Sequence, residues 1–144
     1  MNLYDLDYSL WLEDQITNLR HRQWDSLDID HLVEELEALS ASNRRELYSY
    51  VVILLAHLLK WEFQPSYRSG SWKGSIQNSR RRIARLFKDQ PSLRPYLSEI
   101  LLEAYQEACE LAQDETGLRL FPFELPYGVE EILSLEFFPG QPSN

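Results

Sequence analysis

The sequence predicts an all-α protein, a helical bundle of about five main helices with a proline-rich C-terminal tail. Apolar residues recur with a period near 3.6 through most of the chain, as on the buried side of a helix. No segment shows the sustained alternation and β-branched enrichment typical of a strand. A chain of 144 residues, of which 44% are hydrophobic, has the size and composition of one globular domain. We therefore expect a single helical domain over residues 1–144.

The first half of the chain predicts three helices. The first covers about residues 7–20, and the second runs from an N-cap at Asp28 to about residue 39. The apolar stripe of the second helix consists of Ile29, Leu32, Val33 and Leu36. The sequence Ser-Ala-Ser-Asn at residues 40–43 is expected to break the helical pattern. A third helix over residues 44–63 is apolar on nearly all sides, which predicts that it is the central element of the bundle.

The second half predicts two further helices and a tail. A turn-rich loop precedes a helix that begins at Ser71 or Trp72 and ends at residues 89–92. The cleanest helical spacing follows, from Leu93 to a stop at Gly117. The tail is expected to hold one short helix at about residues 129–135 and otherwise to pack as extended chain on the outside, since it contains Pro122, Pro126, Pro139 and Pro142.

Cysteine content and hydropathy predict a cytoplasmic protein without a membrane span. The lone cysteine, Cys109, cannot form an intramolecular disulfide, and we expect it to be a small core residue. The N-terminal residues are acidic and lack the features of an export signal. The longest apolar run, residues 50–59, is about half as long as a bilayer span requires.

Charge is distributed unevenly along the chain. Residues 60–95 carry 9 basic and 2 acidic residues, whereas the segments on either side are strongly acidic and the whole chain has a net charge of −9. The exposed part of this basic segment is predicted to be a basic patch on the fourth helix, formed by Arg81, Arg82, Arg85 and Lys88. We expect the acidic segments to neutralise it within the fold, with a protein partner and nucleic acid as the alternatives.

A polar seam is predicted along the central helix. Within about 90° of one another on that helix lie Glu46, Tyr50, His57, Lys60 and Gln64. Buried polar groups need hydrogen-bond partners, so a structural network is favoured over a groove in which His57 acts as acid or base. Arg80 is expected to face inward and to pair with a carboxylate such as Glu37 or Glu46.

The segment His31-Leu32-Val33-Glu34-Glu35 has a spacing that could bring two metal ligands together on one helix. The same spacing places His31, Glu34 and Glu35 opposite the apolar stripe. A solvated acidic surface is therefore favoured over an interface or a metal site, and we predict neither a metal nor a cofactor.

Several composite motifs occur in one order along the chain. The main ones are Tyr4-Asp5-Leu6-Asp7-Tyr8 with Trp11, Leu32-Val33-Glu34-Glu35-Leu36-Glu37, His57-Leu58-Leu59-Lys60-Trp61 with Gln64-Pro65, Pro91-Ser92-Leu93, and Glu115-Thr116-Gly117 before Phe121-Pro122. Over residues 4–139 the chain resembles the bacterial, mostly cyanobacterial, family called domain of unknown function twenty-nine. The resemblance implies an all-α fold and no established activity. His31 stands where the family more often has asparagine.

Together these features favour a non-enzymatic protein-interaction module, because no complete set of catalytic residues is recognisable. The expected partner is another protein, without nucleic acid or membrane, and self-association is left open. Two alternatives remain: a small hydrolase-like or nucleic-acid-processing enzyme that uses His57 with Glu37 and Arg80, and a nucleic-acid binder that uses the basic patch.

Overall fold

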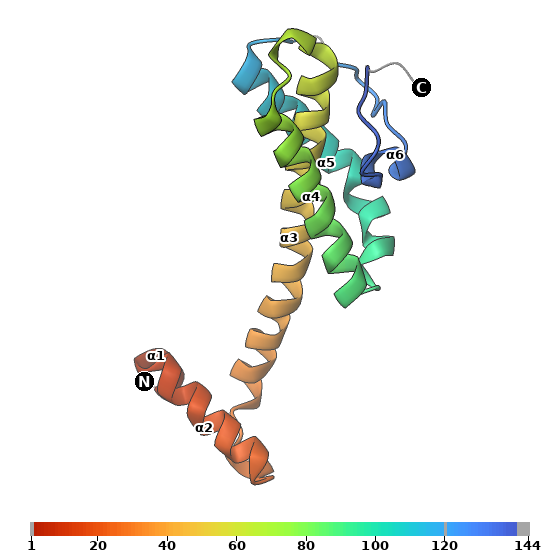
Figure 1. Ribbon diagram of the computed structural model, residues 1–144. Helices are drawn as coiled ribbons and strands as arrows, with labels where there is room; N and C mark the ends of the chain where they lie inside the picture. Colours follow the sequence, from red (N-terminus) through yellow and green to blue (C-terminus); the bar gives the residue numbers. More distant parts are fainter. Residues whose placement is uncertain (1, 120, 141–144) are drawn as a thin grey trace. The chain divides into compact units, whose positions relative to one another are not determined.

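A computed structural model describes residues 2–119 and 121–140 and shows an all-α protein (Figure 1). The described residues form six α-helices and two short 3-10 helices, with no strand among them, which confirms the predicted fold class. The chain divides into two compact units, residues 1–43 and residues 44–144, and each is described by itself below. The expectation of a single domain stays a prediction.

The N-terminal unit (residues 1–43) is a helical hairpin. One arm consists of α1 (Leu3–Leu6) and α2 (Tyr8–Arg20), and the other is the beginning of α3 (Ile29–Phe63). The carboxylate of Asp7 caps α2, since its Oδ1 accepts a hydrogen bond from the Leu10 amide at 3.0 Å. The connection between the arms contains the 3-10 helix η1 (Trp24–Ser26). The predicted helix over residues 7–20 therefore agrees with α2 to within one residue.

Helix α3 is one continuous helix of 35 residues where the sequence predicted two. The expected break at residues 40–43 is wrong. Ordinary residues differ in helix propensity by at most about 0.7 kcal/mol each, and this segment contains neither glycine nor proline. Once a helix exists, each added residue contributes its own hydrogen bond, so weak helix formers do not stop it. The described residues thus form four main helices, because two predicted helices are joined in α3.

The C-terminal unit (residues 44–144) is a bundle of the second part of α3 with α4 (Gly70–Asp89) and α5 (Leu93–Thr116), which lie side by side (Figure 1). Helix α3 contributes the largest share of buried residues, ten between Leu47 and Trp61. The start of α4 and the end of α5 agree with signals in the sequence. Ser69 caps α4 by accepting a hydrogen bond from the Trp72 amide at 3.2 Å, and Gly117 ends α5 with φ 75°.

Residues 121–140 pack against this bundle. They include the short helix α6 (Val129–Leu133), and they bury Tyr127 and Ile132 in the same core as α3, α4 and α5. Tyr105 of α5 donates a hydrogen bond to the Pro122 carbonyl at 2.6 Å, and Tyr127 donates one to the Leu58 carbonyl at 3.3 Å. Pro142, the last proline of the predicted tail, lies outside the described residues.

None of the helices in residues 2–119 and 121–140 combines the length and the apolar character that crossing a bilayer requires.

Candidate functional site

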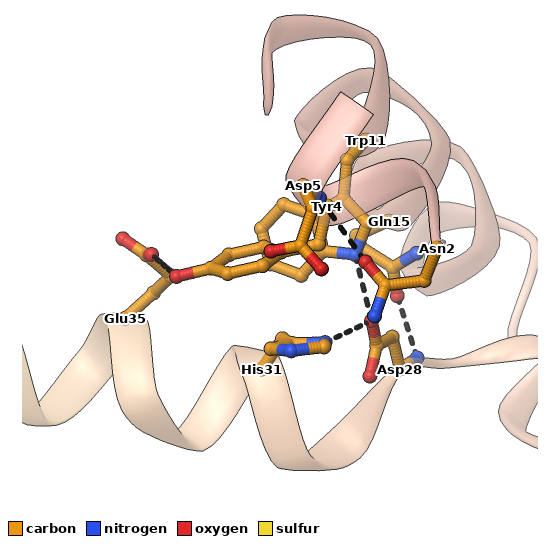
Figure 2. Close-up of polar contacts among 8 residues, drawn as sticks. All are labelled: Asn2, Tyr4, Asp5, Trp11, Gln15, Asp28, His31 and Glu35. Atoms are coloured by element: carbon orange, nitrogen blue, oxygen red, sulfur yellow. Dashed lines mark hydrogen bonds and ion pairs between the residues drawn. The ribbon is translucent and has the colours of Figure 1, made fainter. Parts of the chain in front are cut away.

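Aromatic and acidic side chains join the two arms of the N-terminal unit (Figure 2). We call this set the aromatic–acid cluster, and its members are Tyr4, Tyr8, Trp11, Asp28, His31 and Glu35. The rings of Tyr4, Tyr8 and Trp11 contact one another, with centroids 4.8 to 5.8 Å apart, although Asp7 between α1 and α2 is not helical. His31 and Glu35 lie one turn apart on α3 and face the arm formed by α1 and α2.

Asp28 is the central acceptor of this cluster. Its Oδ2 accepts a hydrogen bond from Trp11 Nε1 at 2.9 Å and lies 2.7 Å from His31 Nδ1. The hydrogen bond to His31 lowers the pKa of Asp28, and the same bond raises the pKa of His31 above its usual value. The imidazolium form is thereby favoured, because the adjacent carboxylate stabilises its charge.

Glu35 holds the other side of the cluster. Its two carboxylate oxygens accept hydrogen bonds from Tyr4 at 2.5 Å and from Tyr8 at 2.6 Å. These bonds lower the pKa of Glu35, and the bond to Glu35 raises the pKa of Tyr4 to about 12. The Tyr4 ring also stacks on His31, with centroids 4.0 Å apart and planes 14° apart (Figure 2). Tyr4 therefore contacts both members of the cluster that lie on α3, Glu35 and His31.

The hydrogen bonds within this cluster favour a structural role. Asp28 occupies Nδ1 of His31, and no hydroxyl or thiol of the described residues hydrogen-bonds to that ring. His31 and Glu35 were expected on a solvated acidic surface, and this expectation is wrong for both, because Glu35 is bonded to two tyrosines and His31 to Asp28. The cluster thus positions the two arms of the hairpin. Sequence reasoning missed it, because the hydrogen bonds that join the two arms link residues 17 to 31 positions apart.

An apolar groove, here called the N-terminal groove, lies between the same two arms. Its volume is about 480 Å³. Its walls are almost wholly apolar, with Glu35 as the one charged member, and consist of Tyr8, Trp11, Leu12, Leu19, Leu27, Ile29, Leu32, Val33, Glu35, Leu36 and Leu39. The apolar stripe predicted for residues 28–39 therefore lines an open surface in this unit.

Exposure of that stripe is high for such apolar side chains. Ile29 is 55% exposed, Leu36 64% and Leu39 63%. The unit surrounding them is acidic, since residues 1–43 contain ten acidic residues and only two basic ones, Arg20 and Arg22. An apolar groove within an acidic surface is unusual for a part of the chain with no binding role.

The predicted polar seam does not form one network in the structure. Lys60 is buried and pairs with Glu115 of α5, and its ammonium lies 5.4 Å from the centre of the Trp72 ring. His57 Nδ1–H donates to the Ile53 carbonyl one turn earlier at 2.8 Å, and burial lowers the pKa of His57. The remaining members make no hydrogen bond to these two in the described residues: Glu46 is exposed, while Tyr50 and Gln64 are half-buried.

Arg80 faces inward as predicted, but the expected pairing with Glu37 or Glu46 is wrong. Its guanidinium donates to three backbone carbonyls, those of Ile132 (2.9 Å), Glu131 (3.2 Å) and Phe137 (2.8 Å), and to the Gln77 side chain (3.1 Å). Burial lowers the pKa of Arg80 to about 10, so the group stays protonated at neutral pH. Its planar fork of donors suits several carbonyls as well as it suits one carboxylate.

The basic patch is exposed along α4, as the sequence predicted. Arg85 Nε lies 3.1 Å from Asp89 Oδ2, and both side chains are exposed. Arg81, Arg82 and Lys88 form no ion pair with any described residue. The expected neutralisation within the fold is therefore limited to Arg85 as far as direct ion pairs are concerned.

A second concavity of about 310 Å³ lies in the C-terminal unit, between α5 and the segment at Phe121–Phe123. Cys109 borders it and is half-buried, and burial raises the pKa of its thiol. This lining mixes polar and apolar side chains. An adjoining concavity of about 540 Å³ is lined by Leu102, Tyr105, Gln106, Phe123, Glu124 and Leu125. The N-terminal groove has the longer continuous apolar lining and is therefore the stronger candidate.

Comparison with known proteins adds a family. A family model described as Domain of unknown function DUF29 matches residues 3–138, which confirms the resemblance found in the sequence. No curated protein and no solved structure matches the chain.

Proposed function

This chain belongs to the DUF29 family, whose description assigns no activity, and we propose that it is a non-enzymatic module that binds another protein through the N-terminal groove. The observation that carries the proposal is the exposed apolar stripe of α3 along that groove. Continuous apolar surface of this kind is what protein-binding sites present before a partner covers them.

Covering the exposed stripe supplies part of the free energy that binding needs. Burying a leucine or isoleucine fully contributes about 1.5–3 kcal/mol. Ile29, Leu36 and Leu39 are 55%, 64% and 63% exposed, so covering what remains exposed contributes roughly 3–5 kcal/mol from this side of the interface. This offsets part of the roughly 4–15 kcal/mol that association costs, and the apolar face of the partner must supply the rest.

The polar groups of the chain support binding better than catalysis. His57 hydrogen-bonds to the Ile53 carbonyl of its own helix, and burial lowers its pKa. Arg80 is bonded to backbone carbonyls and to Gln77. His57 and Arg80 therefore share no hydrogen bond or common partner among the described residues, as members of one catalytic site would. The enzyme alternative therefore has less support than the interaction module.

Capture from an extract of the native cell tests the proposal, using three forms of the protein in parallel. The first is the wild type, the second carries Leu36→Glu and Leu39→Glu in the groove, and the third carries Leu102→Glu on α5. Leu102 is a matched control because it is 69% exposed and lines a concavity of the C-terminal unit rather than the groove. The proposal requires a protein that wild type and the Leu102 variant retain and the groove variant loses.

Polyanion binding through the basic patch is a second candidate, favoured by the absence of ion pairs for Arg81, Arg82 and Lys88 among described residues. Retention on heparin would fall steeply with salt if these residues contacted phosphates. Charge reversal of Arg81, Arg85 and Lys88 should then abolish retention. Equal elution of wild type and variant at low salt would remove this candidate.

A further inference from the structure

We propose that the N-terminal groove binds an amphipathic helix of a partner protein, with apolar residues on one face and lysine or arginine residues beside them. This inference rests on the proposed function and names the chemistry of its partner. Three properties of the groove carry it: its helical walls, the order of residues along α3, and the charge of the unit.

The walls of the groove favour a helical occupant. Both walls are helices, α2 and the beginning of α3, whose backbone groups are bonded within each helix. Such walls offer no free backbone edge to an extended peptide, so the occupant must satisfy its own backbone hydrogen bonds. A helix does so, and it can place side chains between the two walls as in ordinary helix packing.

The length of the apolar wall sets the size of the occupant. Residues 29–39 span about 15 Å at 1.5 Å per residue. A partner helix of about three turns covers that length, with apolar side chains at positions such as i, i+3 or i+4, and i+7. The groove volume of about 480 Å³ accommodates several side chains of that kind.

An acidic stripe runs beside the apolar stripe on α3. Ile29, Val33 and Leu36 line the groove at positions i, i+4 and i+7. Each is followed in the sequence by an exposed acid, these being Asp30, Glu34 and Glu37. Successive residues are about 100° apart around a helix, so Asp30 and Glu37 form a row at one margin of the groove, and Glu34 lies further round the helix, away from the apolar stripe.

This row is available to a basic partner. Asp30 and Glu37 form no ion pair with any described residue. Lysine or arginine residues flanking the apolar face of a partner helix would meet these acids along the margin. Complementary charge of this kind speeds association and selects the partner.

Charge also argues against two other occupants. A second copy would bring two units with ten acidic and two basic residues each into contact, and like charges repel. The basic helix α4 of a second copy cannot supply the apolar face, because its Ile76, Ile83 and Leu86 are buried in its own core. An anionic membrane surface would be repelled by the same acidic unit.

Fluorescence anisotropy with designed peptides and the full chain tests the inference. The probe is a labelled peptide of about 18 residues with leucine at the a and d positions of a heptad and lysine at most others. One matched peptide keeps the leucines and replaces lysine by glutamate, and another has the composition of the probe with its leucines scattered. Titrations are run at about 150 mM salt, where exposed charges are partly screened.

We expect the lysine probe to bind at least about tenfold more tightly than either matched peptide. The double variant Leu36→Glu, Leu39→Glu should weaken binding of the probe at least about tenfold although it adds negative charge, because it removes apolar contacts. The variant Leu102→Glu adds charge elsewhere and should stay within about twofold of wild type. Replacing Asp30 and Glu37 by their amides should weaken binding about three- to tenfold.

Several results would overturn the inference: equal binding of the scattered peptide, undiminished binding to the groove variant, concentration-dependent dimers that the groove variant abolishes, or binding to phosphatidylserine vesicles in preference to the probe. Circular dichroism of each variant checks that helicity is retained. If cell-extract capture depends on the groove while the lysine probe fails, the partner chemistry is wrong and the proposed function stands. If capture is indifferent to the groove, the proposed function itself is wrong.

Discussion

Replacing Arg80 by methionine removes the donors that hold residues 131–137 against α4. Methionine keeps an unbranched side chain of similar length, so the buried stem of Arg80 is replaced without a large cavity. Three backbone carbonyls, those of Glu131, Ile132 and Phe137, lose their charged donor. The Arg80 guanidinium also lies 5.4 Å from the centre of the Phe138 ring, and this cation–π contact is lost as well.

The magnitude follows from opposing terms. A hydrogen bond from a charged donor contributes about 1.5–3 kcal/mol, so three of them contribute roughly 5–9 kcal/mol at most. Removing a buried charge offsets part of this loss, because desolvation of an ion costs several kcal/mol. We therefore expect the free energy of unfolding to fall by about 2–4 kcal/mol. Arg80→Lys should recover less than half, since an ammonium lacks the planar fork of donors.

Urea unfolding at pH 7, followed by circular dichroism, measures this loss, and amide hydrogen exchange reports whether residues 131–137 become less protected. Arg81→Met is the matched control, because Arg81 is the next residue on α4, is exposed and forms no ion pair with described residues. It should change stability by no more than about 0.5 kcal/mol. A loss below about 1 kcal/mol for Arg80→Met would refute the assignment of these carbonyls to Arg80.

Three further predictions concern the other titratable groups. The pKa of His31 is raised by Asp28, so this pair should stabilise the fold fully below the usual histidine pKa of 6.5, and the contribution should disappear as pH rises through the pKa of the folded state. Urea unfolding of wild type and His31→Asn between about pH 5 and 9 should show that difference. Lys60→Met should be neutral or stabilising because it removes a buried charge, whereas Glu115→Ala should cost about 1–3 kcal/mol by leaving the Lys60 ammonium unpaired; thermal melts of both decide. His57→Ala and Arg80→Met should act additively to within about 0.5 kcal/mol, since the two residues share no hydrogen-bond partner, and a double-mutant cycle that shows stronger coupling would restore the predicted seam network.

Sequence reasoning succeeded where the deciding interactions are local. The periodicity of residues 7–20, the glycine at 117 and the apolar run within residues 44–63 each depend on neighbours within a few positions, and the structure agrees with all three. It failed at residues 40–43 for a related reason. The residues of this segment neither strongly favour nor strongly oppose a helix, so the helical residues on either side decide that α3 continues through it.

Only part of the candidate site could be predicted from the sequence. The apolar stripe that begins at Ile29 was recognised from its spacing, but spacing cannot say whether a stripe is covered. Its exposure depends on how the hairpin places α2, and on contacts such as that of Tyr4 with Glu35, 31 residues away. The basic patch shows the same limit, since its exposure could be predicted from spacing, whereas the single ion pair that it forms among the described residues, between Arg85 and Asp89, was not predicted.

The sequence by itself determined the fold class, the family and most helix ends, because helical periodicity, caps and stop signals act over one or two turns. Tertiary structure alone decided which polar and apolar groups meet. Arg80 finds its acceptors 51 to 57 residues further along the chain, in carbonyls that every residue carries and that no side-chain pattern can distinguish. The N-terminal groove likewise exists only because two helices meet with their apolar faces partly open. Long-range contacts of this kind depend on the packing of whole elements, which local sequence does not encode residue by residue.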